Sequence, residues 1–356
     1  MHLLFINHSK GSGIYGIEQW MLRMGRELVR QGHCASIACR AESGLFEAAP
    51  EFGIEPHALP IRSAMELAAA LRLRKLLVSG HINAVIGKTY KGVRVAAMAR
   101  IGLGIPLFCR RGNPLDVRNT LRHRLTLGLT GARIIAPSQA VKNSFCEAPW
   151  LNPERVHVLR HGIDPAEYGD VAPQAVSGCE ALILFAGRLA PVKGVDVLLS
   201  AWAEVIRERP NARLVILGSK EAVDYEGMAK ALGIQDTVAW AGYKKDIRPW
   251  LAAADLLVMP SRTEGAGLAA LEAMAMGRAV VASRAGGIPE YVRDNDCGLL
   301  VEPENPGALA RALLRLIANP DERARMGQAG RRRAFSEFSL AASARTLISW
   351  IQPART

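Results

Sequence analysis

Short apolar runs alternate with amphipathic helical patterns along most of the chain. Strand-like runs come first at residues 2–7, 35–39, 84–86, 107–109 and 133–136, with helical stretches at 17–30, 64–78, 93–101 and about 119–129. A second series has strand-like runs at 182–186, 213–217, 237–239, 256–259 and 279–282, separated by helical patterns near 195–208, 226–231, 248–253, 268–276 and 306–318. Because strands that alternate with helices form parallel sheets, the pattern predicts an α/β protein with two doubly wound, Rossmann-like domains. Ligands of such sheets bind at the carboxyl ends of the strands, so we expect the two domains to face each other across a cleft.

The alternation is interrupted once, at residues 169–180. This stretch is rich in Gly, Pro, Ala and Ser and has no period, which is typical of a linker. We therefore expect an N-terminal domain over residues 1–168, a linker over 169–180 and a C-terminal domain over 181–335. Residues 336–356 are expected to form a C-terminal helix that could cross back to the N-terminal domain.

Charge is unevenly distributed over the 356 residues, which carry a formal net charge of +12. Residues 72–124 contain twelve Lys and Arg and a single acid, Asp116. Such a stripe attracts nucleic acid, an acidic membrane surface or a phosphorylated substrate, or it is only a solvated basic face. No run of 18 apolar residues predicts a membrane-spanning helix, and the six scattered cysteines form no Cys-x-x-Cys pair, which favours a reducing cytoplasm.

A glycine-rich segment at residues 11–16 (GSGIYG) lies between a predicted strand and a predicted helix. It matches the G-x-G-x-x-G pattern, in which glycines let the backbone approach a phosphate at a helix N-terminus. The residue at the end of the next strand is Arg40 instead of an acid, so an NADP-dependent oxidoreductase is one alternative. A tight turn without a ligand is another.

Two further motifs in the second half favour chemistry on a diphosphate. In the first, Arg188 and Lys193 stand five residues apart in a turn between a strand and a helix, where two fixed cations suit a diphosphate leaving group. In the second, Glu264 and Glu272 are separated by seven residues, with Gly265 and Gly267 exposing backbone amides between them. A carboxylate inside an apolar helical run needs a partner, and ribose hydroxyls or a structural Arg would serve for Glu272. A third glycine turn, over residues 283–290, is interpreted as structural.

The chain resembles family 4 of the retaining glycosyltransferases, including transferases of the lipopolysaccharide-core type, over nearly its whole length. The resemblance rests on Gly16-Ile17-Glu18, Gly32-His33, Pro137-Ser138, His161-Gly162-Ile163-Asp164, Gly187-Arg188 with Lys193-Gly194, Pro260-Ser261 with Glu264-Gly265, Glu272-Ala273-Met274-Ala275 and Gly286-Gly287-Ile288-Pro289-Glu290. It implies the B-type glycosyltransferase fold. It also implies retaining, metal-independent transfer from a nucleotide-diphosphate sugar, without a further cofactor.

The same resemblance implies roles for individual residues of the donor site. Arg188 and Lys193 bind the diphosphate, and Glu264 holds the donor sugar. The rest of the expected donor site consists of Gly16, Gly265, Ala266, Gly267, Leu268 and Glu272, with Tyr243 and Lys244 near the nucleotide base. Glu272 would bind the ribose. The short acidic stretch Asp294-Asn295-Asp296 resembles a metal motif but lies in a polar loop, so we expect no metal site.

The chain departs from the family pattern on the acceptor side. Tyr15-Gly16 replaces two adjacent glycines, and Ala266 stands where a bulky residue is usual. Arg110-Arg111 occupies the place of a frequent histidine, which leaves His161 as the candidate catalytic histidine. We expect Tyr15, Arg110 and Arg111 to contact an anionic acceptor.

The sequence thus predicts a hexosyl- or heptosyl-type glycosyltransferase acting on a lipid-linked or lipopolysaccharide-core acceptor. It would lie in the cytoplasm at the inner face of a membrane, with its basic N-terminal domain against acidic headgroups. The alternatives are a nucleotide-sugar epimerase of the same fold, the NADP oxidoreductase and a basic nucleic-acid-binding protein. The last is disfavoured, because 6% aromatic residues provide few stacking platforms and no nucleic-acid module is present.

Overall fold

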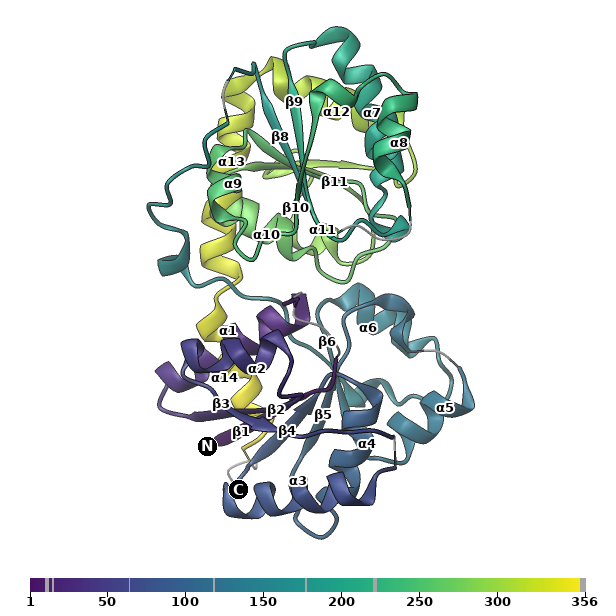
Figure 1. The fold of residues 1–356 in the computed structure, drawn as a ribbon, viewed down its shortest axis with the longest axis vertical. Coiled ribbons are helices and arrows are strands. Elements are labelled where there is room, and N and C mark those ends of the chain that lie inside the picture. Colours follow the sequence, from purple (N-terminus) through teal and green to yellow (C-terminus); the bar gives the residue numbers. More distant parts are fainter. Residues whose placement is uncertain are drawn as a thin grey trace. The chain divides into compact units, whose positions relative to one another are not determined.

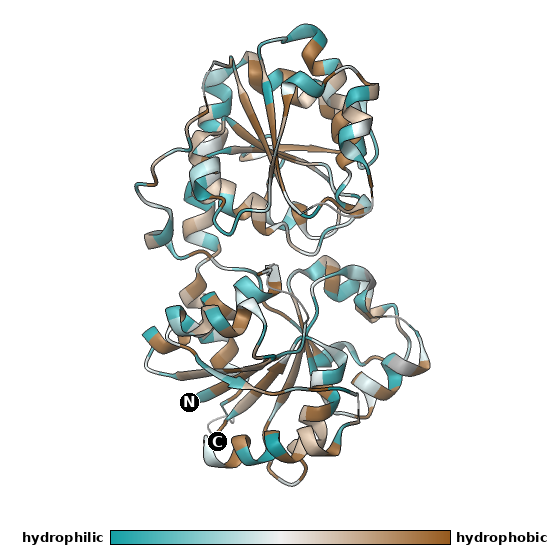
Figure 2. Ribbon diagram, in the orientation of Figure 1, coloured by the Kyte–Doolittle hydropathy of each residue, from teal (hydrophilic) through white to brown (hydrophobic). Residues whose placement is uncertain are grey.

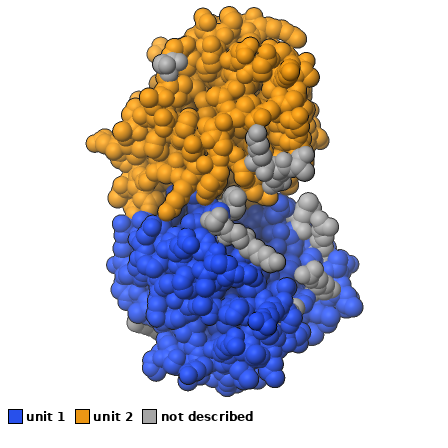
Figure 3. Space-filling model, in the orientation of Figure 1, with its two compact units in different colours: residues 1–162, 340–356 blue, residues 163–339 orange. Residues whose placement is uncertain are grey.

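The chain forms two compact units, residues 1–162 with 340–356 and residues 163–339 (Figure 3). The computed structural model describes residues 1–9, 13–14, 16–63, 65–117, 119–176, 178–219 and 223–352, without the side chains of 115 and 122. Each unit is an α/β body with its own parallel sheet (Figure 1). The predicted fold class is therefore confirmed.

Unit 1 is built on a seven-stranded parallel sheet with the order β3-β2-β1-β4-β5-β6-β7. Its strands are β1 (His2–Asn7), β2 (Cys34–Cys39), β3 (Glu55–Ala58), β4 (Ala84–Gly87), β5 (Leu107–Arg110), β6 (Arg133–Ala136) and β7 (Val156–Val158). The central strands are mainly apolar because both faces of the sheet are covered by helices. The order reverses between β1 and β4, which is the switch point where such sheets bind ligands.

The helices of unit 1 form one layer on each face of this sheet. They are α1 (Gly16–Arg30), α2 (Gly44–Ala48), α3 (Leu67–Ser79), α4 (Tyr90–Ala99), α5 (Leu121–His123), α6 (Gln139–Cys146) and α14 (Leu340–Ser349). A π-helical turn over 124–128 extends α5. Buried side chains of α3, α4, α6 and this turn share one hydrophobic core, and those of α1, α2 and α14 share the core on the opposite face.

Unit 2 has a six-stranded parallel sheet with the order β10-β9-β8-β11-β12-β13. Its strands are β8 (Leu182–Ala186), β9 (Arg213–Leu217), β10 (Val238–Gly242), β11 (Leu256–Met259), β12 (Ala279–Ser283) and β13 (Gly298–Val301). Its helices are α7 (Val195–Glu208), α8 (Tyr225–Ala231), α9 (Arg248–Ala253), α10 (Leu268–Ala275), α11 (Ile288–Tyr291), α12 (Pro306–Ala318) and α13 (Pro320–Glu337). The switch point lies between β8 and β11.

The chain passes between the units after Gly162 and again after Ser339. Within unit 2 the two crossing segments pair directly, since the Ile163 amide donates to the Phe338 carbonyl at 2.7 Å. Residues 163–180, divided in our expectation between the N-terminal domain and a linker, group with unit 2. The Gln174 amide there donates to the Pro249 carbonyl at 2.9 Å. The C-terminal α14 packs in unit 1, beside α1.

Hydropathy follows this architecture (Figure 2). The strands are coloured as apolar and the outer surfaces of most helices as mixed or polar. No helix within the described residues is both long enough and apolar enough to cross a membrane.

Candidate functional site

The residues expected to bind a diphosphate follow β8, at the switch point of unit 2. The Gly187 amide donates to the Leu217 carbonyl at 3.0 Å, which holds the turn carrying Arg188 against the end of β9. Arg188 is exposed. The turn then continues into a 3₁₀ segment over Pro191–Lys193 and enters α7. A guanidinium and an ammonium group thus stand at the carboxyl edge of the sheet.

Gly194 allows this turn to lie against the segment that follows β11. Its φ is +66°, in the left-handed region, and a Cβ there would overlap the carbonyl oxygen of Pro260. Only glycine meets both conditions without strain. As a result Lys193 reaches Glu264, and the two side chains form an ion pair while remaining 21% and 15% exposed. The Glu264 Oε1 also accepts the amide of Gly265 at 3.1 Å.

Arg262 fastens the same two segments together and was not predicted from the sequence. Its Nη1 and Nη2 donate to the two carboxylate oxygens of Asp196 at 2.9 and 2.6 Å, and its backbone amide donates to the Val192 carbonyl at 2.9 Å. The Arg262 hydrogen bonds lower the pKa of Asp196. The one sequence signal was an acid in the first turn of α7 together with an Arg two positions before Glu264. Such a bidentate pair fixes the spacing between the diphosphate turn and the carboxylate segment.

The second carboxylate of the motif, Glu272, lies inside unit 2. Gly267 begins α10 at φ +78°, and the side chain of Ala266 packs into the hydrophobic core. Glu272 is 5% exposed, and its Oε1 accepts the hydroxyl of Tyr168 at 3.0 Å. A tyrosine hydroxyl therefore supplies one of the partners that a buried carboxylate needs. No pattern in the sequence predicts that Tyr168, 104 residues before Glu272, donates a hydrogen bond to it.

The third glycine turn supports Glu264 through the backbone. Gly286 has φ +53°, and a Cβ there would overlap the Glu264 carbonyl oxygen. That same oxygen accepts the Gly287 amide at 3.1 Å. The turn leads directly into α11. The turn therefore holds the backbone of Glu264 in place.

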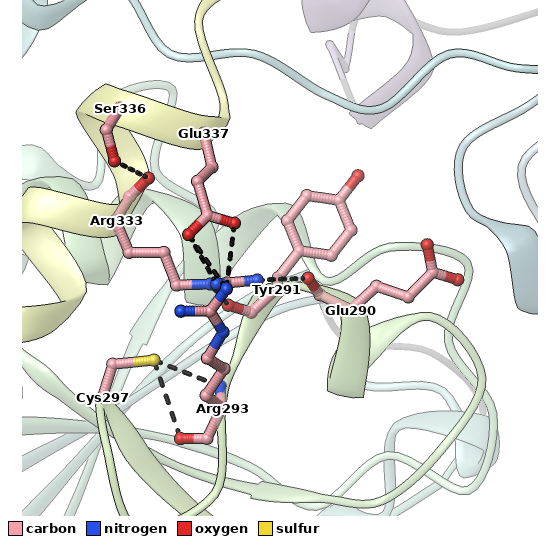
Figure 4. Close-up of polar contacts among 7 residues, drawn as sticks. All are labelled: Glu290, Tyr291, Arg293, Cys297, Arg333, Ser336 and Glu337. Atoms are coloured by element: carbon pink, nitrogen blue, oxygen red, sulfur yellow. Dashed lines mark hydrogen bonds and ion pairs between the residues drawn. The ribbon is translucent and has the colours of Figure 1, made fainter.

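Arg333 of α13 holds the other end of α11 (Figure 4). Its Nε donates to the Tyr291 carbonyl and its Nη2 to the Glu290 carbonyl, both at 2.9 Å. Its Nη1 donates to Glu337 at 2.8 Å. Because helix carboxyl ends leave carbonyls without partners, a planar guanidinium caps them well. Arg333 is only 9% exposed, so we regard it as a positioning residue for the turn that carries Glu264.

The residues expected near the base lie at the carboxyl end of the edge strand β10. Gly242 has φ +70°, and its carbonyl accepts the Gly218 amide at 3.0 Å. Tyr243 is 41% exposed, and the Lys244 Nζ lies 5.6 Å from the centre of the Trp250 ring. This loop therefore ends on the same edge of the sheet as the diphosphate turn.

On the side of unit 1, two expected site residues are buried. Arg110 is 1% exposed; its guanidinium stacks 4.0 Å above the Trp20 ring and donates to the Leu159 carbonyl at 3.1 Å. Its Nη2 lies 3.4 Å from Nε2 of His161. A side chain this buried presents almost no surface to an acceptor. Burial, together with Arg110 and Arg23, lowers the pKa of His161 well below its usual value, so the ring is neutral at neutral pH.

Arg111 belongs to a half-buried polar group at the switch point of unit 1. Its Nη2 pairs with Asp116 at 2.9 Å and its Nη1 donates to the Lys88 carbonyl at 2.9 Å. The Lys88 ammonium pairs with Glu18. The Oε1 of Glu18 also accepts a hydrogen bond from the side-chain amide of Asn7 at 2.9 Å. The sequence indicated Glu18 only as part of a motif, and it did not indicate Lys88.

Among the described residues, two polar atoms of this group are buried and have no hydrogen-bond partner, the Nε of Arg111 and the Oε2 of Glu18. A buried donor and a buried acceptor left open at a switch point are suited to a polar ligand. The other residues expected at this site are Gly16 and Tyr15. Gly16 is the exposed first residue of α1, and Tyr15 lies outside the described residues, as do Gly11 and Ser12 of the glycine-rich segment.

The acidic stretch that resembled a metal motif has a structural role. Asp294 accepts the Leu300 amide at 2.9 Å and pairs with Arg284 at 2.9 Å, and so closes the loop before β13. In the part of the chain that the structure describes, no group of three or more His, Cys, Asp or Glu side chains is arranged to hold a metal ion.

The sequence matches two family models. "Glycosyltransferase Family 4" covers residues 14–167, and "Glycosyl transferases group 1" covers residues 172–333. The chain is 30% identical to the D-inositol 3-phosphate glycosyltransferase of Streptomyces scabiei, over 90% of this chain and 83% of that protein. It is 33% identical to the enzyme of the same name from Streptomyces coelicolor, over 72% and 66%.

Solved structures share the fold at lower identity. HepE of Anabaena, in complex with UDP and glucose, has a TM-score of 0.81 and 22% identity, with 98% of each chain covered. WaaG, a glycosyltransferase involved in lipopolysaccharide biosynthesis, has a TM-score of 0.74 and 19% identity, with 99% of this chain and 100% of that chain covered.

Two tandem doubly wound units, each with its own parallel sheet, give the chain the GT-B glycosyltransferase fold. The chain belongs to family 4 of these enzymes. The oxidoreductase alternative is not favoured by any of these matches.

Proposed function

We propose that this protein transfers a hexosyl or heptosyl group from a nucleotide-diphosphate sugar to an anionic, lipid-linked or lipopolysaccharide-core acceptor. Transfer would proceed with retention, without a metal ion or further cofactor, at the cytoplasmic face of a membrane. The observation that carries the proposal is the Lys193–Glu264 pair beside Arg188 at the switch point of unit 2. Cations for a leaving diphosphate and a carboxylate for a sugar are thereby held together.

The cations supply what the leaving group requires. When the bond between the anomeric carbon and the phosphate oxygen breaks, its electron pair stays on the diphosphate. Lys193, Arg188 and the amino end of α10 would stabilise this charge, and removing a fixed group of this kind costs about 2–4 kcal/mol. Lys193 has three donor hydrogens, so it can keep Glu264 and still reach a phosphate.

The carboxylates would hold the two ends of the donor. Glu264, with the backbone of residues 265–268, would accept hydroxyl groups of the sugar. Glu272 would bind the ribose, while Tyr168 occupies its Oε1 and fixes its orientation. Tyr243 and Lys244 would border the nucleotide base.

Retention of the anomeric configuration restricts which group can take the proton of the acceptor hydroxyl. The acceptor oxygen must approach the anomeric carbon from the face that the diphosphate leaves, so the departing phosphate oxygen is the base within reach of the acceptor proton. His161, being neutral and buried, would act as a hydrogen-bonding group and not as a general acid.

An anionic acceptor fits the polar group of unit 1. The ammonium of Lys88 and the guanidinium of Arg111, each already paired with a carboxylate, would donate their remaining hydrogens to the anionic group, and the Oε2 of Glu18 would accept an acceptor hydroxyl. The relatives named above act, by their names, on D-inositol 3-phosphate, which supports a phosphorylated acceptor. Arg110 enters this proposal only through its contact with His161.

A thermal-shift panel of UDP, GDP, ADP and CMP tests donor binding, with UDP expected to act because HepE binds it. A ligand at 100 times its Kd should stabilise the protein by roughly 2.7 kcal/mol. The anomeric configuration of the product, read by NMR, tests retention, and full turnover in excess EDTA tests metal independence. No shift with any of the nucleotides would overturn the proposal, and activity lost in EDTA and restored by Mg²⁺ or Mn²⁺ would overturn its metal-free mechanism.

A further inference from the structure

Exposed apolar side chains are concentrated on one part of unit 1. Of the thirteen large apolar side chains that are exposed in the described residues, eight lie between positions 65 and 129. These eight are 47% to 78% exposed, whereas the described part of unit 2 has four, which are 37% to 42% exposed. Single exposed apolar residues are ordinary, but a concentration of them marks an interaction surface.

Helix α3 has two apolar stripes. Leu73 and Leu77 face inward and belong to the core of unit 1. On the outside, Leu67 and Leu71 are 66% and 59% exposed and Val78 is 55% exposed. At 3.6 residues per turn, these three positions fall within roughly 40° of arc on the helix surface. Figure 2 shows hydrophobic and hydrophilic residues interspersed along this helix. The inner stripe packs in the core, whereas the outer stripe is exposed and is not covered by any described part of unit 1.

The elements beside α3 continue this apolar surface. Arg74 of α3 donates to the carbonyls of Ala99 and Ile101 at 3.0 and 2.6 Å, so Ile101, which is 70% exposed, lies at the edge of α3. Arg94 of α4 donates to Thr126 at 2.8 Å and so joins α4 to the π-helical turn.

That turn carries a third set of exposed leucines. Leu121, Leu125 and Leu129 recur every four residues and are 70%, 47% and 78% exposed. Because α3, α4 and this turn cover the same face of the sheet, their outer sides form one surface. We call the outer side of α3, the carboxyl end of α4 and residues 121–129 the α3–α4 surface.

Positive charge accompanies the leucines. Arg72 and Lys75 are exposed on α3, and Lys75 lies next to the outer stripe, one turn beyond Leu71. Arg124 is exposed beside Leu125. The sequence from 72 to 124 has a single acid, Asp116, and the structure pairs it with Arg111. Net positive charge on the α3–α4 surface is therefore not neutralised from within its own segment.

We propose that the α3–α4 surface docks unit 1 on an anionic lipid bilayer, with its leucines at the headgroup–acyl boundary. The inference rests on the proposed function in that a lipid-linked acceptor would be reached from such a surface. Apolar side chains interleaved with Lys and Arg are what an interfacial helix presents to acidic lipids. Charge complementarity favours a bilayer over a second copy of this chain, because two such basic surfaces would repel each other.

Vesicle co-sedimentation of the full chain tests the proposal. The lipids are phosphatidylcholine alone and phosphatidylcholine with phosphatidylglycerol. We expect binding only to the vesicles that contain phosphatidylglycerol. Leu67→Gln with Leu71→Gln should reduce the partition coefficient at least tenfold, as should Arg72→Glu with Lys75→Glu. The charge-dependent part should weaken at 1 M salt, where the Debye length is about 3 Å.

Matched control variants come from exposed positions of unit 2. Leu232→Gln removes an exposed leucine, and Arg311→Glu with Lys230→Glu reverses two exposed charges there. These variants should bind vesicles as the unaltered protein does. Melting temperature and nucleotide-induced thermal shift should be unchanged in every variant, which separates loss of docking from loss of folding or of donor binding.

The outcomes are distinct. If the unaltered protein ignores anionic vesicles while UDP or another nucleotide stabilises it, the docking surface is refuted and the proposed function stands. If vesicles bind but no nucleotide does, docking stands and the proposed function fails. If the leucine variant instead turns a dimer into a monomer in analytical ultracentrifugation and vesicle binding is absent, the α3–α4 surface joins copies of the chain. Preferential binding to random-sequence DNA over vesicles would likewise overturn the proposal.

Discussion

Lys193 and Glu264 form an ion pair across 71 residues of sequence. Their backbones are brought together because a glycine at 194 lets one turn lie on the carbonyl of Pro260. Each charge thus compensates the other, which limits the cost of holding both half-buried.

Removing either cation of the diphosphate turn should slow transfer strongly. Lys193→Ala and Arg188→Ala each remove a group that acts on developing negative charge, so we expect a loss of about 2–4 kcal/mol in kcat/KM for the donor. Isothermal titration with the nucleotide diphosphate and steady-state kinetics measure the effect. Lys230→Ala, at an exposed position of α8, is the control. Near-normal turnover in both site variants would remove the assignment.

Replacing Arg333 should loosen the turn behind Glu264. Arg333→Lys keeps the charge but loses the fork that holds the Glu290 and Tyr291 carbonyls, at a cost of about 1–3 kcal/mol in the free energy of unfolding. Because the turn behind Glu264 leads into α11, the change should raise KM for the donor. Vesicle binding, which does not involve the donor, should stay the same. Arg332→Lys, an exposed neighbour on α13, should leave both stability and KM unaltered.

The Tyr168–Glu272 hydrogen bond should couple stability to ribose binding. Tyr168→Phe keeps the ring and leaves a buried carboxylate short of one donor, which costs about 1–3 kcal/mol. Glu272→Gln should remove much of the preference for a ribose over a deoxyribose diphosphate. Combining the two changes should cost less than their sum, because both act on one interaction. Strict additivity in urea unfolding would contradict a shared role.

Gly286 should tolerate no side chain. Gly286→Ala forces a Cβ onto the Glu264 carbonyl at a positive φ, so we expect loss of donor binding and a destabilisation above 2 kcal/mol, roughly the upper end of the cost of the left-handed conformation alone. Gly233→Ala isolates that conformational cost, since φ there is +70° and nothing lies within 4 Å of its Cβ. Equal melting temperatures for the two variants would show that the close approach is unimportant.

Acid should destabilise unit 1 through His161. The pKa of this ring is lowered in the folded state, so below its ordinary value of about 6.5 the unfolded chain binds a proton that the folded chain does not. Stability is therefore fully present above that pH and falls with acidification by up to about 1.4 kcal/mol per pH unit. His161→Gln should flatten this dependence between pH 7 and 5 in urea unfolding, relative to the unaltered protein. An unchanged slope would mean that His161 does not titrate differently in the two states.

Much of the fold could be predicted from the sequence, because central parallel strands are continuous apolar runs. The bounds predicted for β1, β6, β8, β9 and α12 agree with those observed. The edge strands β3 (Glu55–Ala58), β7 and β13 were not among the predicted strands. β3 carries polar residues and, at Pro56, a residue without a backbone donor, so it lacks the apolar signature. β7 and β13 have only three and four residues, which is too short for a clear pattern.

The sequence by itself determined the chemistry-bearing residues of the candidate site in unit 2, because glycines, cations and carboxylates at fixed spacing reflect local backbone requirements. Their partners were decided by tertiary structure alone. Tyr168, Arg262 and Arg333 act on residues 104, 66 and 42 or 43 positions away, and no local pattern encodes such a pairing. Arg110 shows the same limit, since an arginine after a strand resembles a ligand-binding residue until the fold stacks it on Trp20. Spacing along the chain determines which groups lie in the same turn. Whether a side chain is buried, and which side chains it contacts, depends on elements that meet only when the sheet has formed.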